Sequence, residues 1–208
     1  MTPGTAIIKK CSACSKPIAQ HTIGSGNTFG ATFWTDGKRE APMLPDRPWL
    51  IMCPHCHAPL WLDELTKLGE VEAFGNRSGE FKDACEYKTP VPDDYFALLV
   101  TGVADPKKER YVRVHAWWAG NNQRRTTGGE SPMSPFETAN LTALAHSLND
   151  SVANDLVMKA EAMRELGRFD DALSLLAKSV DKNIGQAVEI IKGLARKRDP
   201  YVREMRFN

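Results

Sequence analysis

The sequence predicts an α+β protein in which a small β-rich module precedes a mainly α-helical domain. Four of the five cysteines form two Cys-x-x-Cys pairs within the first 56 residues. Short β-branched and aromatic segments, separated by glycine and proline, surround those pairs. After residue 92, apolar residues at helical spacing and helix-capping signals dominate. We therefore expect a module over residues 1–62, a connecting region over 63–91 and a helical domain over 92–208.

Length and composition limit the class of protein. The chain of 208 residues accommodates one or two domains, and 42% hydrophobic residues can form a buried core. The formal net charge of +1 gives no overall attraction to nucleic acid or to an anionic membrane. The N-terminal residues lack the apolar run of a signal peptide, and no run of about 18 apolar residues predicts a transmembrane helix. Together with cysteines that are free or bound to metal rather than in disulfides, these features predict a cytoplasmic protein.

The two cysteine pairs have the spacing of a tetrahedral metal site. Cys11 and Cys14 form the first pair, and Cys53 and Cys56 form the second after 38 intervening residues. Four thiolates complete the coordination of one structural Zn²⁺ and leave no position open for a substrate. The pairs resemble the knuckles of zinc-ribbon modules, and this resemblance implies one structural zinc ion held by these four cysteines.

The second pair can also be interpreted as a redox site. Cys53-Pro54-His55-Cys56 also resembles the active-site sequence of thioredoxin-like thiol oxidoreductases, and the apolar residues 49–52 suit the strand that precedes it. In that fold a helix begins at the motif, and its N-terminus lowers the thiol pKa. Pro59 is unfavourable inside such a helix, and the interpretation gives Cys11 and Cys14 no role. It remains the weaker alternative.

Other residues near the pairs have simpler explanations. His21, His55 and His57 are candidate substitute ligands, but four cysteines already complete the tetrahedron. Cys85 belongs to no pair and is expected to be an ordinary thiol. The glycine-rich run at 24–30 lacks the Gly-Lys-Ser/Thr ending of a phosphate-binding loop, so it predicts a turn.

The elements of the first module follow in order. Strands are expected at 6–10, 21–23, 31–34 and 49–52. Between the third and fourth strands, Asp36-Gly37 predicts a hairpin turn. The segment 63–94 carries nine acids against four bases and is dotted with glycine, which predicts a solvated connection with one short helix.

Helix signals fill the second half of the chain. Asp105 before Pro106 predicts a helix over about 107–121, and a second start is expected at Pro92. Ser134-Pro135-Phe136-Glu137 forms a capping box that opens a further helix. An apolar stripe on the first of these helices includes Tyr111, Val114 and Trp118, with Val112 and Ala116 beside it. The adjacent tryptophans at 117 and 118 are therefore expected in a core.

Residues 158–176 resemble a tetratricopeptide repeat. Leu166-Gly167-Arg168-Phe169 matches the turn between the two helices of such a repeat, and Asp171-Ala172 matches its second helix. Gly167 can adopt the left-handed conformation that ends a helix. A further apolar pattern at 184–197 predicts the next helix. The resemblance implies a helical hairpin at about 151–181 and a surface that binds protein, although stable arrays need about three repeats.

The expected function is a non-enzymatic adaptor in which zinc folds the first module and the helical domain binds another protein. The sequence has no catalytic triad order, Walker loop, His-Glu-x-x-His motif or dinucleotide fingerprint. The combination of ribbon and helices resembles bacterial proteins. A nucleic-acid-binding regulator is the main alternative, because six basic residues cluster in the sequence, namely Lys107, Lys108, Arg110, Arg113, Arg124 and Arg125.

Overall fold

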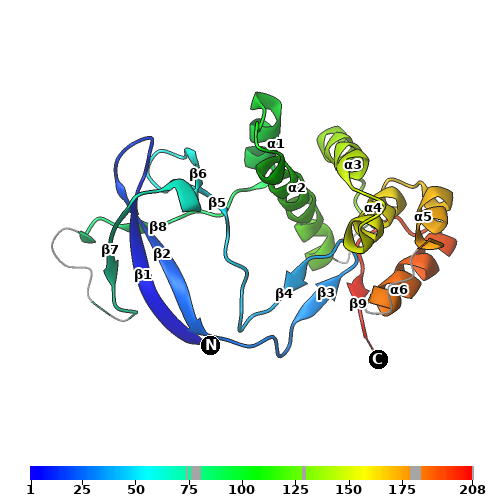
Figure 1. The fold of residues 1–208 in the computed structure, drawn as a ribbon, viewed down its shortest axis with the longest axis horizontal. Helices are drawn as coiled ribbons and strands as arrows, with labels where there is room; N and C mark the ends of the chain where they lie inside the picture. The colour runs from blue at the N-terminus through cyan, green and yellow to red at the C-terminus, as the bar shows by residue number, and fades with distance from the viewer. Residues whose placement is uncertain (74, 76–80, 128–129, 179–183, 208) are drawn as a thin grey trace. The chain divides into compact units, whose positions relative to one another are not determined.

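The computed structural model of the protein describes residues 1–73, 75, 81–127, 130–178 and 184–207. The α+β class is confirmed, because β-sheets carrying the four paired cysteines precede a helical region (Figure 1). The chain divides into two compact units. Unit 1 comprises Met1–Ala31 and Glu40–Pro90, and unit 2 comprises Thr32–Arg39 and Val91–Asn208.

Unit 1 contains a four-stranded sheet in the order β7-β1-β2-β8. Its strands are β1 (Thr2–Lys10), β2 (Pro17–Ser25), β7 (Lys67–Val71) and β8 (Cys85–Glu86). The long hairpin of β1 and β2 is antiparallel, with Ile8 opposite Ala19, and both residues are fully buried. Alternation along β1 explains the pairing, because Ala6 and Ile8 face the core while their neighbours are more exposed.

A short second hairpin carries the other cysteine pair. It consists of β5 (Leu50–Met52) and β6 (Pro59–Trp61), and a 3-10 turn, η1 (Leu62–Glu64), follows directly. All three residues of β5 are buried. Ile51, Leu60, Leu62 and Leu65 pack with Ile18 of β2 in one cluster. This cluster also contains Cys11 and Cys53, so it packs directly against both cysteine turns.

The structure differs from the expected connecting region at 63–91. Within it, β7 pairs with β1 on one side of the main sheet, and β8 pairs with β2 on the other. The sequence of β7 has no run of apolar residues that would predict a strand, because β7 is an edge strand with no buried residue. The expected centre of the connection spans residues 75–79, and all of these except Gly75 lie outside the described residues.

Unit 2 contains six helices among its described residues. They are α1 (Pro92–Thr101), α2 (Pro106–Thr127), α3 (Pro135–Ser147), α4 (Ala153–Glu165), α5 (Phe169–Leu176) and α6 (Gly185–Arg196). The predicted starts at Pro92, Asp105 and Ser134 are confirmed. The Asp105 carboxylate accepts backbone N–H groups from Lys107 at 2.7 Å and Lys108 at 3.1 Å. Ser134 forms a reciprocal capping box with Glu137.

The predicted helical hairpin is present as α4 and α5. Gly167 between them has φ of 76°, the left-handed conformation expected at a helix C-terminus. Ala160 and Ala172 are fully buried and allow the two helices to pack closely, and Phe169 is also buried. Trp117 lies in the same core and Trp118 packs at its border, as predicted. The last residues of the expected hairpin, 179–181, lie outside the described residues.

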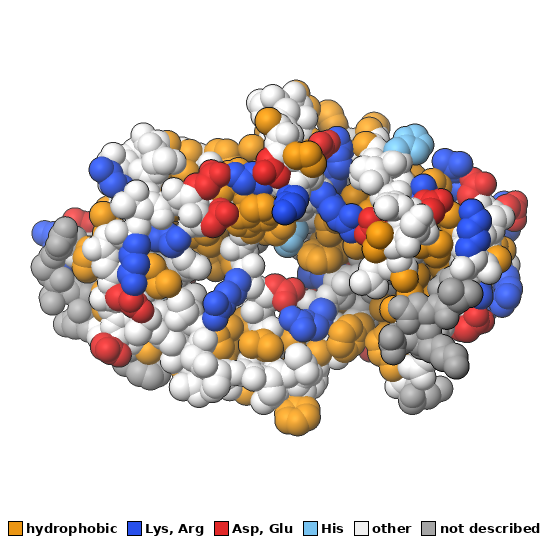
Figure 2. Space-filling model, viewed as in Figure 1, with side chains coloured by type: hydrophobic (Ala, Val, Ile, Leu, Met, Phe, Trp, Pro, Cys, Tyr) orange, Lys and Arg blue, Asp and Glu red, His pale blue; other side chains and the backbone are white. Residues whose placement is uncertain are grey.

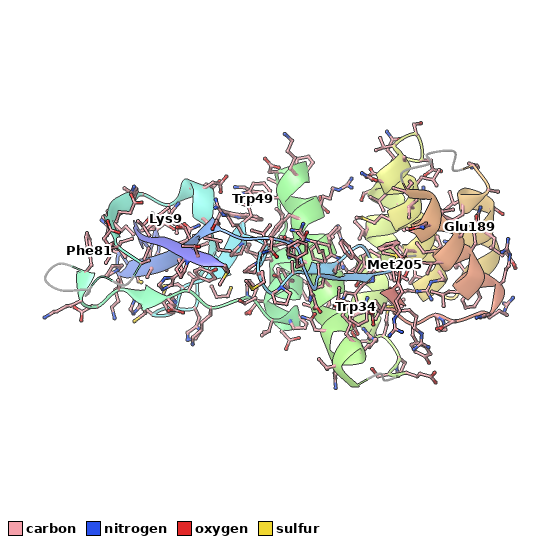
Figure 3. All side chains as sticks on the ribbon, turned by 90° about the horizontal axis from the view of Figure 1, so that it is seen from below. Lys9, Trp34, Trp49, Phe81, Glu189 and Met205 are labelled. Carbon is pink, nitrogen blue, oxygen red and sulfur yellow. The ribbon has the colours of Figure 1, made fainter. Side chains whose placement is uncertain are left out.

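A three-stranded sheet in the order β4-β3-β9 lies in unit 2 except for Glu40, the last residue of β4. It contains β3 (Thr32–Trp34), β4 (Arg39–Glu40) and β9 (Glu204–Met205), and Figure 3 labels Trp34 and Met205 on it. Gly37 has φ of 80° in the predicted Asp-Gly turn. The division therefore differs from the expected module over 1–62, because Thr32–Arg39, between the two cysteine pairs, packs in unit 2.

Candidate metal centre

Each cysteine pair lies in the turn of a β-hairpin in unit 1. Cys11 and Cys14 lie between β1 and β2, and Cys53 and Cys56 lie between β5 and β6. The first cysteine of each pair is fully buried at the end of its strand. These hairpins explain why residues far apart in the sequence converge, because both pack on the same core cluster.

The two turns have the same backbone hydrogen bonds. Cys11 donates its N–H to the carbonyl of Lys16 at 3.0 Å, and Cys53 donates to Ala58 at 2.9 Å. The carbonyl of each of these cysteines accepts the N–H of the residue four positions later, at 3.0 Å in both turns. The Cys14 N–H also points at the Cys11 sulfur, at 3.4 Å. Each turn thus presents its two sulfurs on one side.

The four sulfur atoms converge on one point. All four Sγ atoms lie within 4.8 Å of one another. The Sγ atoms of Cys11 and Cys56 are 3.9 Å apart, and those of Cys14 and Cys53 are 3.8 Å apart. A tetrahedron with metal–sulfur bonds of about 2.3 Å has sulfur–sulfur edges of about 3.8 Å. The cluster therefore has the dimensions that a single metal ion bound by four thiolates requires.

The pKa values of the two buried thiols, Cys11 and Cys53, differ. Burial raises the pKa of the Cys53 thiol to about 12. Burial also acts on Cys11, but the backbone N–H groups of Cys14 and Ala13 outweigh it and bring the pKa of that thiol to about 7. Metal binding requires thiolates, so an ion at this site would displace the proton that burial holds on Cys53.

The structure does not add histidine to this cluster. Among the described residues, the group that could hold a metal contains the four cysteines alone. His21 pairs with Glu86 at 3.0 Å, and the Nε2 atom of His55 lies 3.1 Å from the carbonyl oxygen of Pro17. Cys85 is exposed in β8 and is not part of the group.

The geometry at Cys53 differs from the one that the redox interpretation requires. That interpretation expects a helix to begin at Cys53-Pro54-His55-Cys56. The structure instead has a β-hairpin, with β5 before the motif and β6 after it. The sulfur of Cys53 faces Cys14 of the other pair, which the redox interpretation leaves without a role.

The six basic residues of the alternative nucleic-acid surface lie on α2. All four arginines form ion pairs within unit 2. Their partners are Asp155 for Arg110 at 2.5 Å, Glu109 for Arg113 and Glu137 for Arg124 at 2.7 Å each, and Asp36 for Arg125. Figure 2 shows basic and acidic side chains interspersed on the visible face. The sequence cluster is therefore not a concentrated positive surface on the described part of α2.

Sequence reasoning missed a buried polar network in unit 2. Asp36 is fully buried in the β3–β4 turn, where Asn121 donates to its carboxylate at 3.0 Å and Arg125 forms an ion pair. Glu165 accepts hydrogen bonds from Trp117 at 2.8 Å and from Asn121 at 3.1 Å. The network joins the hairpin at 32–39 to helices α2 and α4.

Arg164 extends this network to the C-terminal segment. Its guanidinium is completely buried and binds both carboxylate oxygens of Glu161, at 2.5 and 2.7 Å. It also donates to the backbone carbonyls of Asp199 and Tyr201. The sequence signal was present, because the charges at 161, 164 and 165 are flanked by buried Ala160, Ala162 and Met163, whereas a solvated face has polar neighbours.

Comparisons with known proteins give no relative. No family model, no curated protein and no solved structure matches the chain. The hairpin of α4 and α5 therefore has the predicted local structure without a match to the tetratricopeptide family. Among the described residues, none of the helices combines the length and apolar character needed to cross a membrane.

Proposed function

We propose that Cys11, Cys14, Cys53 and Cys56 bind one structural Zn²⁺ ion that folds unit 1. The convergence of four sulfurs within 4.8 Å carries this proposal. Soft thiolates in a tetrahedral set favour zinc among the common divalent ions. A zinc ion with four protein ligands has no open position for substrate or water, so the role is structural rather than catalytic. Cobalt substitution tests the geometry, because Co²⁺ in a tetrahedral four-thiolate site gives intense visible absorption.

We further propose that unit 2 makes the protein a non-enzymatic adaptor. A cavity of about 310 Å³ in this unit is lined by Val157 and Met158 of α4, Ala187 and Ile191 of α6, Ile184 just before α6, and Met205 of β9. Asn154 and residues 35–37 add a polar side. Apolar grooves between helices are common binding sites for peptide segments of other proteins. The resemblance of α4 and α5 to a repeat that binds protein supports the same role.

A matched pair of variants tests the adaptor proposal. Ala187 lines the cavity and is half-buried, whereas Ala139 is exposed on α3. Ala187→Arg places a charge in the groove, and Ala139→Arg adds the same charge elsewhere on unit 2. Proteins cross-linked to the full chain in cell extract should be lost with Ala187→Arg and retained with Ala139→Arg. Equal recovery with both variants would contradict binding at this groove.

A cytoplasmic location accompanies this proposal, because reducing conditions keep thiolates available for zinc. Nucleic-acid binding through α2 remains the sequence-based alternative. Internal pairing of Arg110, Arg113, Arg124 and Arg125 gives it less support than the adaptor role. Binding to random DNA that weakens steeply with added salt would favour the alternative.

A further inference from the structure

Helix α1 leaves most of its apolar residues in contact with water. After the two acids of its first turn, Asp93 and Asp94, residues 96–100 are five consecutive apolar residues. None of these five is buried, and Tyr95 is the one buried residue among the ten of α1, all of which are described. A surface helix normally presents polar side chains on the face that it does not bury. Between its first turn and Thr101, α1 has no such polar face.

α1 packs on α2 through the side of the helix that carries Tyr95. The short loop 102–105 joins the two helices, and the Tyr95 ring stacks on His115 of α2 with ring centroids 6.2 Å apart. The two helices therefore run antiparallel as a helical hairpin, with α1 beside the first half of α2 (Figure 1). Residues on the side of α1 opposite Tyr95 face away from α2.

The side of α1 that faces away from α2 carries a stripe of residues at helical spacing. Asp93, Phe96, Ala97 and Val100 follow the i, i+3, i+4, i+7 pattern, so their side chains lie along one face of the helix. Val100 is 78% exposed. Ala97, in the middle of the stripe, is also exposed, and its small side chain would let a second helix approach closely.

Phe136 of α3 extends this stripe sideways. Its ring stacks on Phe96 with centroids 5.8 Å apart, and yet Phe136 remains 63% exposed. We call Phe96, Ala97, Val100 and Phe136 together the α1 face. It presents about 400 Å² of apolar surface, which is comparable to the largest patch on a typical monomeric protein. Apolar patches of this size commonly mark a surface that binds another protein.

Charges at the two ends of α1 make this face complementary to itself. Asp93 is exposed at the N-terminal end of α1. Lys107 is exposed at the start of α2, and because α2 returns antiparallel, it lies near the C-terminal end of α1. A second α1 packed antiparallel on the first would bring Asp93 of each copy to the end where the other copy carries Lys107. Two-fold symmetry would therefore pair these opposite charges twice.

We propose that the α1 face binds a second copy of the chain, and that the two α1 helices pack antiparallel in a two-fold symmetric dimer. A two-fold interface uses the same surface of both copies, so one self-complementary face is sufficient. The formal net charge of +1 means that two copies repel each other little. This interface does not depend on the proposed adaptor groove, which α4, α6 and β9 line.

The size of the α1 face determines how stable such a dimer would be. Two copies would remove about 800 Å² of apolar surface from water, and with a polar rim the interface would bury about 1,200 Å² in total. This area lies at the lower limit of stable protein interfaces. We therefore expect a weak dimer with a dissociation constant on the order of 10 μM.

Sedimentation velocity of the metal-loaded full chain, over about 1–200 μM, tests the proposal. The parent should change from monomer to dimer across this range. Val100→Asp places a charge on the α1 face and should leave the chain monomeric, because dimerisation would bury that charge without a partner. Val152→Asp is the matched control. Val152 is 47% exposed at the N-cap of α4, where aspartate is favourable, so this variant should dimerise like the parent.

Charge reversal tests the antiparallel arrangement. Asp93→Lys alone, or Lys107→Asp alone, places like charges opposite each other in both symmetric pairs and should weaken the dimer about tenfold. When the two single variants are mixed, they should associate with each other about as tightly as the parent, because both pairs again join opposite charges. In a parallel arrangement the single reversals would not weaken the dimer.

Four results would overturn the proposal. The first is a parent chain that stays monomeric over the whole concentration range. The second is a dimer that Val100→Asp and Val152→Asp affect equally while both variants keep the circular dichroism of the parent. The third is a dimer that neither charge reversal weakens, or a mixture of the two that recovers no affinity. The fourth is protection of Phe136 from hydroxyl-radical oxidation in the monomer, because another part of the same chain would then cover the face.

Discussion

Ser15 and His57 occupy equivalent positions in the two cysteine turns. Each follows the first cysteine of its pair by four residues, and each donates its backbone N–H to that cysteine's carbonyl at 3.0 Å. Both have the left-handed backbone conformation, with φ of 64° for Ser15 and 59° for His57. This conformation is unfavourable for residues with a Cβ atom. The two turns therefore share both their hydrogen bonds and their strain.

Replacement of Ser15 by glycine should stabilise unit 1. Glycine adopts positive φ without steric cost, and the gain exceeds the entropy that glycine adds to the unfolded chain. We expect Ser15→Gly in the zinc-loaded protein to raise the free energy of unfolding of unit 1 by about 0.5–1 kcal/mol. Ser12→Gly is the control, because Ser12 does not have positive φ, and it should destabilise the unit. Equal effects in urea unfolding would show that the strain at Ser15 is not significant.

The stability of unit 2 should fall as pH rises. Burial, together with the nearby Glu161 and Asp36 carboxylates, raises the pKa of Glu165 to about 8, from an ordinary value of 4.5. Between these values the folded unit holds a proton that the unfolded chain releases, so the free energy of unfolding decreases with pH. We expect a loss on the order of 2–4 kcal/mol from pH 5 to pH 8.5.

Glu165→Gln should remove most of this dependence, because the amide cannot ionise. The melting temperature of the variant should therefore exceed that of the parent at pH 8.5, with a smaller difference at pH 5. Glu189→Gln is the matched control, since the Glu189 side chain is exposed on α6. A parent melting temperature that is flat across this range would contradict burial of a protonated Glu165.

Arg164 should be among the most important residues for the stability of unit 2. Its removal leaves the fully buried Glu161 carboxylate without a counter-charge and frees two backbone carbonyls of the C-terminal segment. Loss of one partner from a buried ion pair costs about 3–5 kcal/mol, and we expect this from Arg164→Ala in thermal unfolding.

Two further variants distinguish the effect of breaking the Glu161–Arg164 ion pair from the effect of removing any arginine. Replacement of both charges, with Glu161→Leu and Arg164→Met together, should cost much less than Arg164→Ala, because no unpaired charge remains. Arg168→Ala removes an exposed arginine paired with Asp171 and should change stability by less than about 1 kcal/mol. If Arg164→Ala matched Arg168→Ala, the Arg164 contacts would not stabilise the fold.

The sequence predicted those features that depend on local chemistry. The spacing of the cysteines, the capping box at Ser134 and the glycine at 167 each report a turn or helix end that neighbouring residues determine. The membership of β7 and β8 in the sheet depends on pairing with β1 and β2, far away in the sequence. The packing of Asp36 in unit 2 likewise depends on Asn121 and Arg125, and no local pattern contains them.

Metal removal should unfold unit 1 and leave unit 2 folded. Cys11 and Cys53 are two of the seven buried residues in one core cluster of unit 1, whereas the core cluster of unit 2 contains none of the four cysteines. A structural zinc site can supply about 10 kcal/mol of folding free energy. With a chelator, amide signals of β1, β2, β5 and β6 should collapse while the helical circular dichroism persists. Simultaneous loss of the helical signal would show that the two units fold as one.

The zinc content and the number of reactive thiols, measured on protein purified without added metal, test the central claim most directly. We predict one zinc ion per chain. Cys11, Cys14, Cys53 and Cys56 should resist alkylation until a chelator is added, whereas the exposed Cys85 should react at once. A chain without zinc that forms a reversible disulfide between Cys53 and Cys56 would contradict the structural metal site and favour thiol redox chemistry.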